Sequence, residues 1–348
     1  MIRMSEAERV QAVKEKWENT LSAIPGVKGV GIANNHILVR VADQATAAKI
    51  PKSIDGVEVR VLIGSVRLLD VYTGRYRPVP GGVSIGNVNI TAGTLSCLVK
   101  ENNTGQLLGL SNAHVMNTPY GPLLGDPKGT PVIQPGSYDG GQVPDDTVGY
   151  TYKWVTVKPP PTPNLVDCAC FKPINTAIVS DRIIDVGLRP LNPVNPTLNM
   201  KVMKVGRTTG LTHAKVSVVG ANNQEIEDGS GHLLATFSDL FEVIVPVAAP
   251  PDEEHRCVDG SFGCGGDSGS LIVEEDTSLP VGLLFAGGYS TDKEGNVYNE
   301  ILGCKATNVA KLLGVSFLEP VTTAGLSFLA SFSLTLLFSA LLWPRGKK

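Results

Sequence analysis

The spacing of apolar residues changes along the chain and divides it. Within residues 5–22 apolar residues recur at helical spacing, and four of them share one face: Val10, Val13, Trp17 and Leu21. The runs VKGVGIA and HILVRVA, separated by Asn34-Asn35, predict two strands joined by a tight turn. QATAAKI predicts a short helix and VEVRVLIGSV a further strand. Residues 1–70 are therefore expected to form a small α/β domain.

The pattern of apolar and turn residues changes after a linker at residues 71–82. Short apolar runs such as SLIVEE, FEVIVPV and VGLLFAGG alternate with turn residues, which accounts for the high counts of 38 Gly and 24 Pro. Many short strands bounded by turns predict closed antiparallel barrels, so the domain at residues 83–317 is expected to be mostly β. The run TNVAKLLGV, residues 307–315, is expected to close it as a helix.

The C-terminal segment is uniformly apolar. Residues 324–343 contain no charge over 20 positions, which predicts a single transmembrane helix. Arg345, Lys347 and Lys348 follow this segment and would favour a cytoplasmic C-terminus, leaving the catalytic domain outside. Residues 1–24 show no apolar signal-peptide core, and this favours the alternative, a catalytic domain that faces the cytoplasm.

Composition and cysteines narrow the function classes. The net charge of -3, with no basic stripe, gives no reason to expect a nucleic-acid partner. Among the six cysteines, a Cys257–Cys264 or a Cys264–Cys304 disulfide is plausible if the domain is exported, and otherwise they are small core residues. The C-x-C spacing is unusual for zinc ligands and therefore argues against a zinc site. Such a site would use Cys168, Cys170, His255, Cys257 and Cys264 as ligands. No metal or cofactor is expected.

The string GCGGDSGS, residues 263–270, carries the sharpest chemical signal. Serine becomes a good nucleophile only when a base takes its proton, which makes Ser268 a candidate nucleophile. Gly266 and Gly269 would let the backbone turn tightly around it. Such a turn can aim the N–H groups of Gly266 and Ser268 at one point, where they would stabilise an oxyanion.

Two further strings supply a base and an acid. His114 ends the strand-like run in LGLSNAHVMN and is the candidate general base. Asp167 interrupts the apolar run NLVDCACF, where a buried carboxylate needs a partner such as a histidine N–H. Asp145 and Asp146 compete for this role, but they lie in a polar turn, which favours solvated turn residues.

Together the strings SNAHV, DCACF and GCGGDSGS resemble the trypsin/chymotrypsin-like serine peptidase family, in the order His, Asp, Ser. The run VGRTTGL, residues 205–211, looks like the hairpin that opens the second barrel in bacterial members of the α-lytic type. The small α/β domain before the barrels is similar to that of a group of prokaryotic trypsin-like proteins. The resemblance covers residues 83–315 and implies two six-stranded barrels with the active site between them.

The sequence departs from the family at several positions. Ser270 stands where the family often has glycine, and Phe285 where a serine commonly supports the triad aspartate. Phe262 stands six residues before Ser268, where the trypsin subgroup has an acid, so a preference for Lys or Arg is not expected. Phe262, Phe285 and Gly287 would instead form a pocket for small or apolar side chains. No suitable cleavage site precedes the barrel, so activation by a newly released N-terminus is not expected. Asp267 therefore needs a different partner for its charge.

The sequence thus predicts a serine endopeptidase with His114, Asp167 and Ser268 as its catalytic triad and a protein or peptide as its substrate. The alternative is a catalytically silent trypsin-like binding or scaffold protein at the membrane. All three triad residues stand in matching strings, which favours the enzyme.

Overall fold

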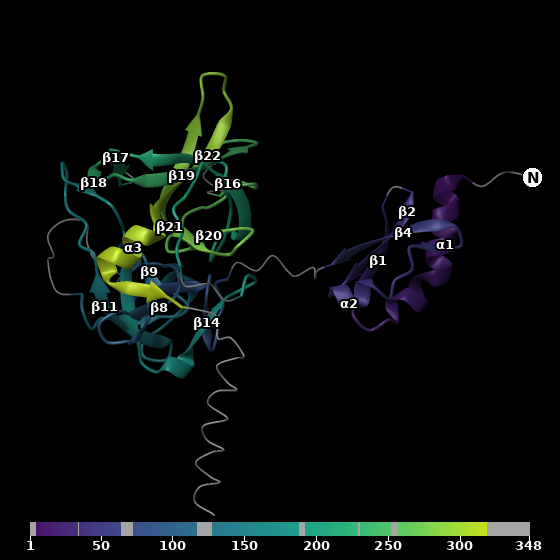
Figure 1. Ribbon diagram of the computed structural model, residues 1–348, viewed down its shortest axis with the longest axis horizontal. Helices are drawn as coiled ribbons and strands as arrows, with labels where there is room; N and C mark the ends of the chain where they lie inside the picture. Colours follow the sequence, from purple (N-terminus) through teal and green to yellow (C-terminus); the bar gives the residue numbers. More distant parts are fainter. Residues whose placement is uncertain are drawn as a thin grey trace, which may run out of the picture. The chain divides into compact units, whose positions relative to one another are not determined.

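The computed structural model describes residues 5–33, 35–63, 72–116, 127–187, 192–228, 230–251 and 257–318. The chain divides into two compact units, Met1–Leu69 and Asp70–Lys348 (Figure 1). The predicted transmembrane segment, residues 324–343, lies outside the described residues. Among the helices of the described ranges, none is both long and apolar enough to cross a bilayer.

The first unit packs one helix against a four-stranded sheet. The helix α1 (Glu6–Ser22) begins at a capping box in which Ser5 N donates to the Glu8 carboxylate at 2.7 Å. The predicted face of α1 joins the core of this unit. The sheet has the order β1-β2-β4-β3, and its elements are β1 (Val27–Ala33), β2 (His36–Val41), α2 (Gln44–Ala47), β3 (Ser53–Ile54) and β4 (Val57–Ile63). The predicted α/β elements of this unit are all present.

The second unit begins with an eight-stranded sheet. Its order is β23-β8-β9-β13-β11-β10-β6-β7. The strands are β6 (Ser84–Asn87), β7 (Gly93–Thr94), β8 (Cys97–Glu101), β9 (Leu107–Ser111), β10 (Pro131–Ile133), β11 (Thr147–Trp154), β13 (Ala169–Pro173) and β23 (Val315–Phe317). One face covers an apolar core that includes Ile85, Leu98 and Phe171. The strand ends carry the candidate base and acid.

A closed six-stranded barrel forms the other half of this unit. Its order is β15-β16-β19-β22-β21-β20, and closure leaves no free edge. The strands are β15 (Lys201–Gly206), β16 (Gly210–Ala221), β19 (Leu240–Val247), β20 (Leu271–Glu274), β21 (Pro280–Thr291) and β22 (Val297–Lys305). The hairpin of β21 and β22 projects beyond the barrel (Figure 1).

The expectation of two six-stranded barrels holds for the second half only. In the described residues the first half is a single eight-stranded sheet, which β23 extends at one edge after helix α3 (Ala306–Leu313). Phe317 of β23 pairs with Val99 of β8. The smaller elements are β5 (Val79–Gly81) with β14 (Val179–Ile183), the sheet of β12 (Pro163–Asn164), β17 (Gln224–Glu227) and β18 (Leu233–Phe237), and short 3-10 turns at His114–Met116, Ser137–Asp139 and Thr176–Ile178.

The sheet and the barrel share one core. Leu108 and Cys170 of the sheet pack in the same buried cluster as Leu283 and Cys304 of the barrel, together with Val309 of α3. Since this cluster contains side chains from both halves, it fixes their relative position. The loops at their junction carry the candidate site.

Candidate active site

The pair of His114 and Asp167 lies where two neighbouring strands of the eight-stranded sheet meet their loops. The antiparallel register of β9 and β13 pairs Ser111 with Ala169, which brings the residues just beyond each strand together. His114 Nδ1 lies 2.6 Å from Asp167 Oδ2. The Asp167 carboxylate is fully buried, and its Oδ1 also accepts the backbone N–H of Ala113 at 2.5 Å. The buried charge is thus satisfied by the imidazole and the chain beside it.

Of the two competing acids, Asp145 is exposed and Asp146 bonds elsewhere. Asp146 accepts a hydrogen bond from Arg75 Nε at 2.8 Å and from the backbone of Gln142 at 3.0 Å. These bonds tie Asp146 to its own turn and to an arginine, and its side chain is 14% exposed, so it is less solvated than the sequence predicts. Asp167 is the aspartate that the structure brings to His114.

A further side chain that the sequence did not single out holds the Asp167 loop. Asn112 is fully buried, and its Nδ2 donates to the backbone carbonyl of Asp167 at 2.7 Å. Its position between an apolar strand and His114 was the available signal, because a buried amide needs a partner.

Ser268 sits in a loop whose two glycines adopt left-handed backbone angles. Gly266 has φ +94° and Gly269 has φ +99°. A Cβ at Gly269 would lie 2.1 Å from the carbonyl oxygen of Thr94, so only glycine fits there. Thr94 N in turn donates to Ser268 O at 2.8 Å. The loop is therefore held against the eight-stranded sheet at Ser268.

The same contact region brings the Ser268 loop to the His114 turn. A Cβ at Gly93 would lie 2.4 Å from Val115 Cγ2 and 3.0 Å from Ser268 O. Val115 follows His114 directly, so Gly93 lies close both to Ser268 and to the residue after His114. The Ser268 hydroxyl itself lies 3.4 Å from the carbonyl oxygen of Phe285.

The predicted oxyanion donors are available. In the described part of the chain, the N–H groups of Gly266 and Ser268 donate to no protein acceptor. The amides of Asp267 and Gly269, on either side of Ser268, bond to backbone carbonyls. Two free amides flanking an occupied one are what a site for a developing oxyanion requires.

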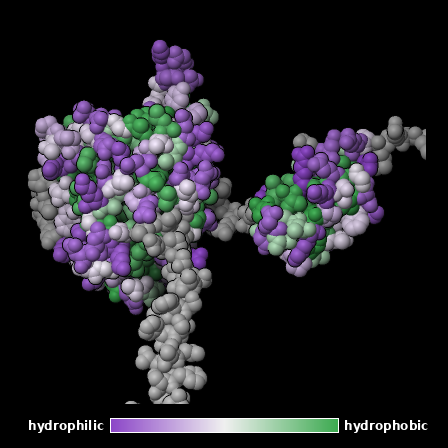
Figure 2. Space-filling model, viewed as in Figure 1, coloured by the Kyte–Doolittle hydropathy of each residue, from purple (hydrophilic) through white to green (hydrophobic). Residues whose placement is uncertain are grey.

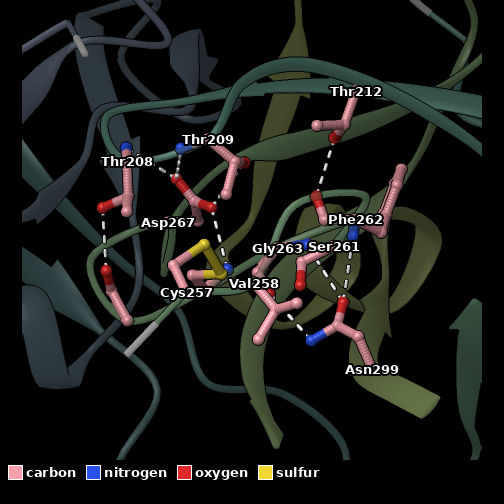
Figure 3. The surroundings of a disulfide bond; sticks show 12 residues. Thr208, Thr209, Thr212, Cys257, Val258, Ser261, Phe262, Gly263, Asp267 and Asn299 are labelled. Carbon is pink, nitrogen blue, oxygen red and sulfur yellow. Dashed lines mark hydrogen bonds between the residues drawn. A yellow bond between two sulfur atoms is a disulfide. The ribbon is translucent and has the colours of Figure 1, made fainter. Parts of the chain in front are cut away.

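The partner that Asp267 needs is a buried lysine. Asp267 and Lys204 are almost completely buried, with Lys204 Nζ 3.4 Å from Asp267 Oδ2. The carboxylate also accepts Thr208 N at 2.8 Å, Thr209 Oγ1 at 2.7 Å and Cys264 N at 2.9 Å (Figure 3). Burial lowers the pKa of Lys204, and the Asp267 charge opposes this shift.

A disulfide closes the segment that leads into the nucleophile loop. Cys257 and Cys264 are joined, which was one of the two predicted pairings (Figure 3). Cys304, the other predicted partner, is a free buried thiol that accepts Asp167 N at 3.3 Å. Cys168 is also free and buried, and burial raises the pKa of both thiols well above its usual value. Because Cys257 and Cys264 form a disulfide, they are not available as thiolate ligands for the zinc site considered above.

A cleft of about 770 Å³ opens beside Ser268, and its lining differs from the predicted pocket. Phe285 and Gly287 line it, but Phe262 does not. Phe262 is 1% exposed and packs in the barrel core, because Thr212 Oγ1 and Asn299 bind its backbone (Figure 3). The structure therefore places Phe262 in the barrel core and not at this cleft.

Acidic side chains line the same cleft: Glu225, Glu227, Glu242 and Glu300. They come from β17, β19 and β22, and the register Ile244↔Glu300 places Glu242 and Glu300 two residues apart on adjacent strands. Burial raises the pKa of Glu242, and the charge of Glu300 raises it further. Figure 2 shows polar residues interspersed with apolar ones on the face of this unit that it presents.

Comparisons with known proteins give structural likenesses only. No family model matches the sequence, and no curated protein matches it. The structure is similar to Thermobifida fusca protease A (15% identity, 70% of this chain and 99% of that chain, TM-score 0.42). It is also similar to a glutamic-acid-specific serine protease that uses a histidine triad in substrate binding (15%, 69% and 100%, TM-score 0.45) and to Cellulomonas bogoriensis chymotrypsin (14%, 70% and 99%, TM-score 0.41). All three are serine proteases.

The pH dependence of the site follows from the His114–Asp167 pair. Burial lowers the pKa of His114, while the Asp167 charge and hydrogen bond raise it, and the net pKa lies above the usual 6.5. Because a general base must be neutral, kcat/KM for a peptide substrate should fall as pH drops through a midpoint above 6.5. Rate measurements between pH 5 and 9 test this, and a midpoint below 6.5 would contradict it.

The buried Lys204–Asp267 pair should contribute strongly to the stability of the folded protein. Lys204→Met leaves a buried carboxylate without its cation, which typically costs about 3–5 kcal/mol. Adding Asp267→Asn should recover part of this loss. Urea unfolding measures both, with the exposed Lys311→Met as the matched control. Equal effects of Lys204→Met and Lys311→Met would show that the pair is unimportant.

Proposed function

We propose that this protein is a serine endopeptidase that hydrolyses peptide bonds through a covalent acyl-enzyme. The observation that carries the proposal is the 2.6 Å contact between His114 Nδ1 and the buried Asp167 carboxylate, beside the Ser268 loop. Asp167 holds the Nδ1 proton, which leaves Nε2 of His114 as the base.

The reaction proceeds in two steps, acylation of Ser268 and hydrolysis of the acyl-enzyme. Ser268 Oγ attacks the substrate carbonyl carbon while His114 Nε2 takes the hydroxyl proton. The carbonyl oxygen becomes negative and is stabilised by the N–H groups of Gly266 and Ser268. His114 then gives its proton to the leaving amine, and the carbon–nitrogen bond breaks. Water repeats the attack on the ester, which releases the acid and restores Ser268.

The silent scaffold is the weaker candidate on physical grounds. Burying the Asp167 carboxylate costs free energy unless donors offset it, and a scaffold gains nothing from directing that charge at a histidine.

Substitution of the triad tests the proposal. Ser268→Ala should lower kcat on the order of 10⁶-fold, since triads act as a unit. Asp167→Asn should lower it by roughly 10⁴ by favouring the wrong tautomer of His114. Asp146→Asn is the matched control, because Asp146 bonds Arg75 and not His114. Peptide hydrolysis that survives Ser268→Ala, or that fails in Asp146→Asn but not in Asp167→Asn, would refute this assignment.

The substrate preference is proposed to be cationic. The sequence favoured small or apolar side chains because Phe262 and Phe285 were assigned to the pocket, and Phe262 lies in the barrel core instead. Glu242 and Glu300 repel one another at the cleft wall. A Lys or Arg side chain near the scissile bond would neutralise them, so binding relieves a repulsion that exists in the free protein.

A peptide library tests this preference. Cleavage next to Lys or Arg should exceed cleavage next to Leu, and the double change Glu242→Gln with Glu300→Gln should reduce that ratio about tenfold or more. Glu294→Gln, at an exposed residue of the β21–β22 hairpin, is the matched control and should leave the ratio unchanged. Strict cleavage after apolar residues by the unaltered chain would contradict the proposed preference.

A further inference from the structure

The direction of each oxyanion donor is set by the carbonyl of the same peptide group. Gly266 N–H shares a peptide with Gly265 O, and Ser268 N–H shares one with Asp267 O. Both peptides are trans, so the N–H and C=O of each point in opposite directions. Whatever holds the carbonyl therefore aims the N–H.

Thr208 holds the first of these carbonyls. Its Oγ1 donates to Gly265 O at 2.8 Å. Thr208 is itself fixed at both ends, because its backbone N–H bonds Asp267 Oδ1 at 2.8 Å and its Oγ1 accepts Arg207 Nη1 at 3.2 Å. Arg207 Nε is anchored in turn on Asp139 Oδ2 at 2.8 Å. The Thr208 hydroxyl accepts from Arg207 and therefore donates its one proton to the Gly265 carbonyl.

Ser270 holds the second carbonyl. Its Oγ donates to Asp267 O at 2.6 Å, and its backbone N–H donates to the same oxygen at 2.9 Å. Ser270 is fully buried, so no water competes for this acceptor. Ser270 stands where the trypsin/chymotrypsin-like family often has glycine. Its hydroxyl adds a second donor to Asp267 O, the carbonyl oxygen of the peptide group that contains the Ser268 N–H.

We propose that Thr208 and Ser270 are positioning residues that orient the two oxyanion donors through the carbonyls of their peptides. This inference rests on the proposed peptidase function. Neither side chain touches the reacting atoms. Each acts by preventing a peptide flip that would turn an N–H away from the substrate and present a carbonyl oxygen to the developing negative charge.

The chain contains a matched control for a purely structural role. Thr212 Oγ1 donates to Phe262 O at 2.7 Å, the same type of bond to the same loop (Figure 3). The N–H of that peptide belongs to Gly263 and bonds Asn299 Oδ1 at 3.3 Å, so it does not serve the oxyanion. Thr212→Val removes a hydroxyl without disturbing a donor.

The test compares Thr208→Val, Thr208→Ser, Ser270→Ala and Thr212→Val in the full chain. Removing one oxyanion donor costs about 10²–10³ in kcat, so misdirecting one through Thr208→Val should cost about 10–100-fold with KM nearly unchanged. Thr208→Ser should restore the rate. Ser270→Ala should have a smaller effect, because the Ser270 backbone N–H still binds the carbonyl. Affinity for a peptide boronate, which places a tetrahedral oxygen at the oxyanion position, should fall with kcat/KM.

The outcomes separate this inference from the proposed function. Equal kcat in Thr208→Val and Thr212→Val, or a raised KM with unchanged kcat, would overturn the positioning role while leaving the peptidase intact. Absence of Ser268-dependent hydrolysis in the unaltered chain would overturn the proposed function, and the positioning role with it.

Discussion

A buried carboxylate, Asp267, constrains the conformation of the loop that carries Ser268. Its charge lies in the interior and must be balanced, because an unpaired buried ion costs several kcal/mol. Lys204 supplies the cation, and the turn at Thr208 and Thr209 together with the Cys264 amide supplies hydrogen bonds. These donors come from separate segments, so satisfying the charge restricts the arrangement of the loop. That arrangement leaves the amides of Gly266 and Ser268 free.

A second buried carboxylate organises the other side of the site by the same principle. Asp167 is balanced by the His114 ring and by the amides beside it. Its own backbone N–H reaches across the shared core to the Cys304 thiol of the barrel. The histidine side of the site therefore depends on the sheet, the serine side depends on the barrel, and the packed core between them holds the two in register.

The sequence predicted the parts of this site that depend on local pattern. His114 and Asp167 each end or interrupt an apolar strand, and the glycines around Ser268 require the backbone angles that the structure shows. The amphipathic face of α1 was predictable for the same reason. The sequence also contains a signal for Lys204, because it is a single lysine within the apolar run VMKVG. Val202 and Val205 of this run are buried.

Long-range contacts set the features that sequence could not predict. Phe262 points into the barrel because Thr212 and Asn299, which lie far from it in sequence, bind its backbone. Glu242 and Glu300 become neighbours only through the register of β19 and β22. The edge strand β23 of the eight-stranded sheet likewise comes from beyond the barrel in sequence and pairs with β8. Neither periodicity nor motif spacing encodes such pairings.

The central claim is that His114 activates Ser268, and covalent labelling tests it most directly. A fluorophosphonate reacts with a serine hydroxyl only when a neighbouring base removes its proton. Mass spectrometry of the labelled full chain should place the adduct on Ser268, and the rate of labelling should collapse in His114→Ala. Labelling at a different serine, or labelling of Ser268 at the same rate without His114, would contradict the account.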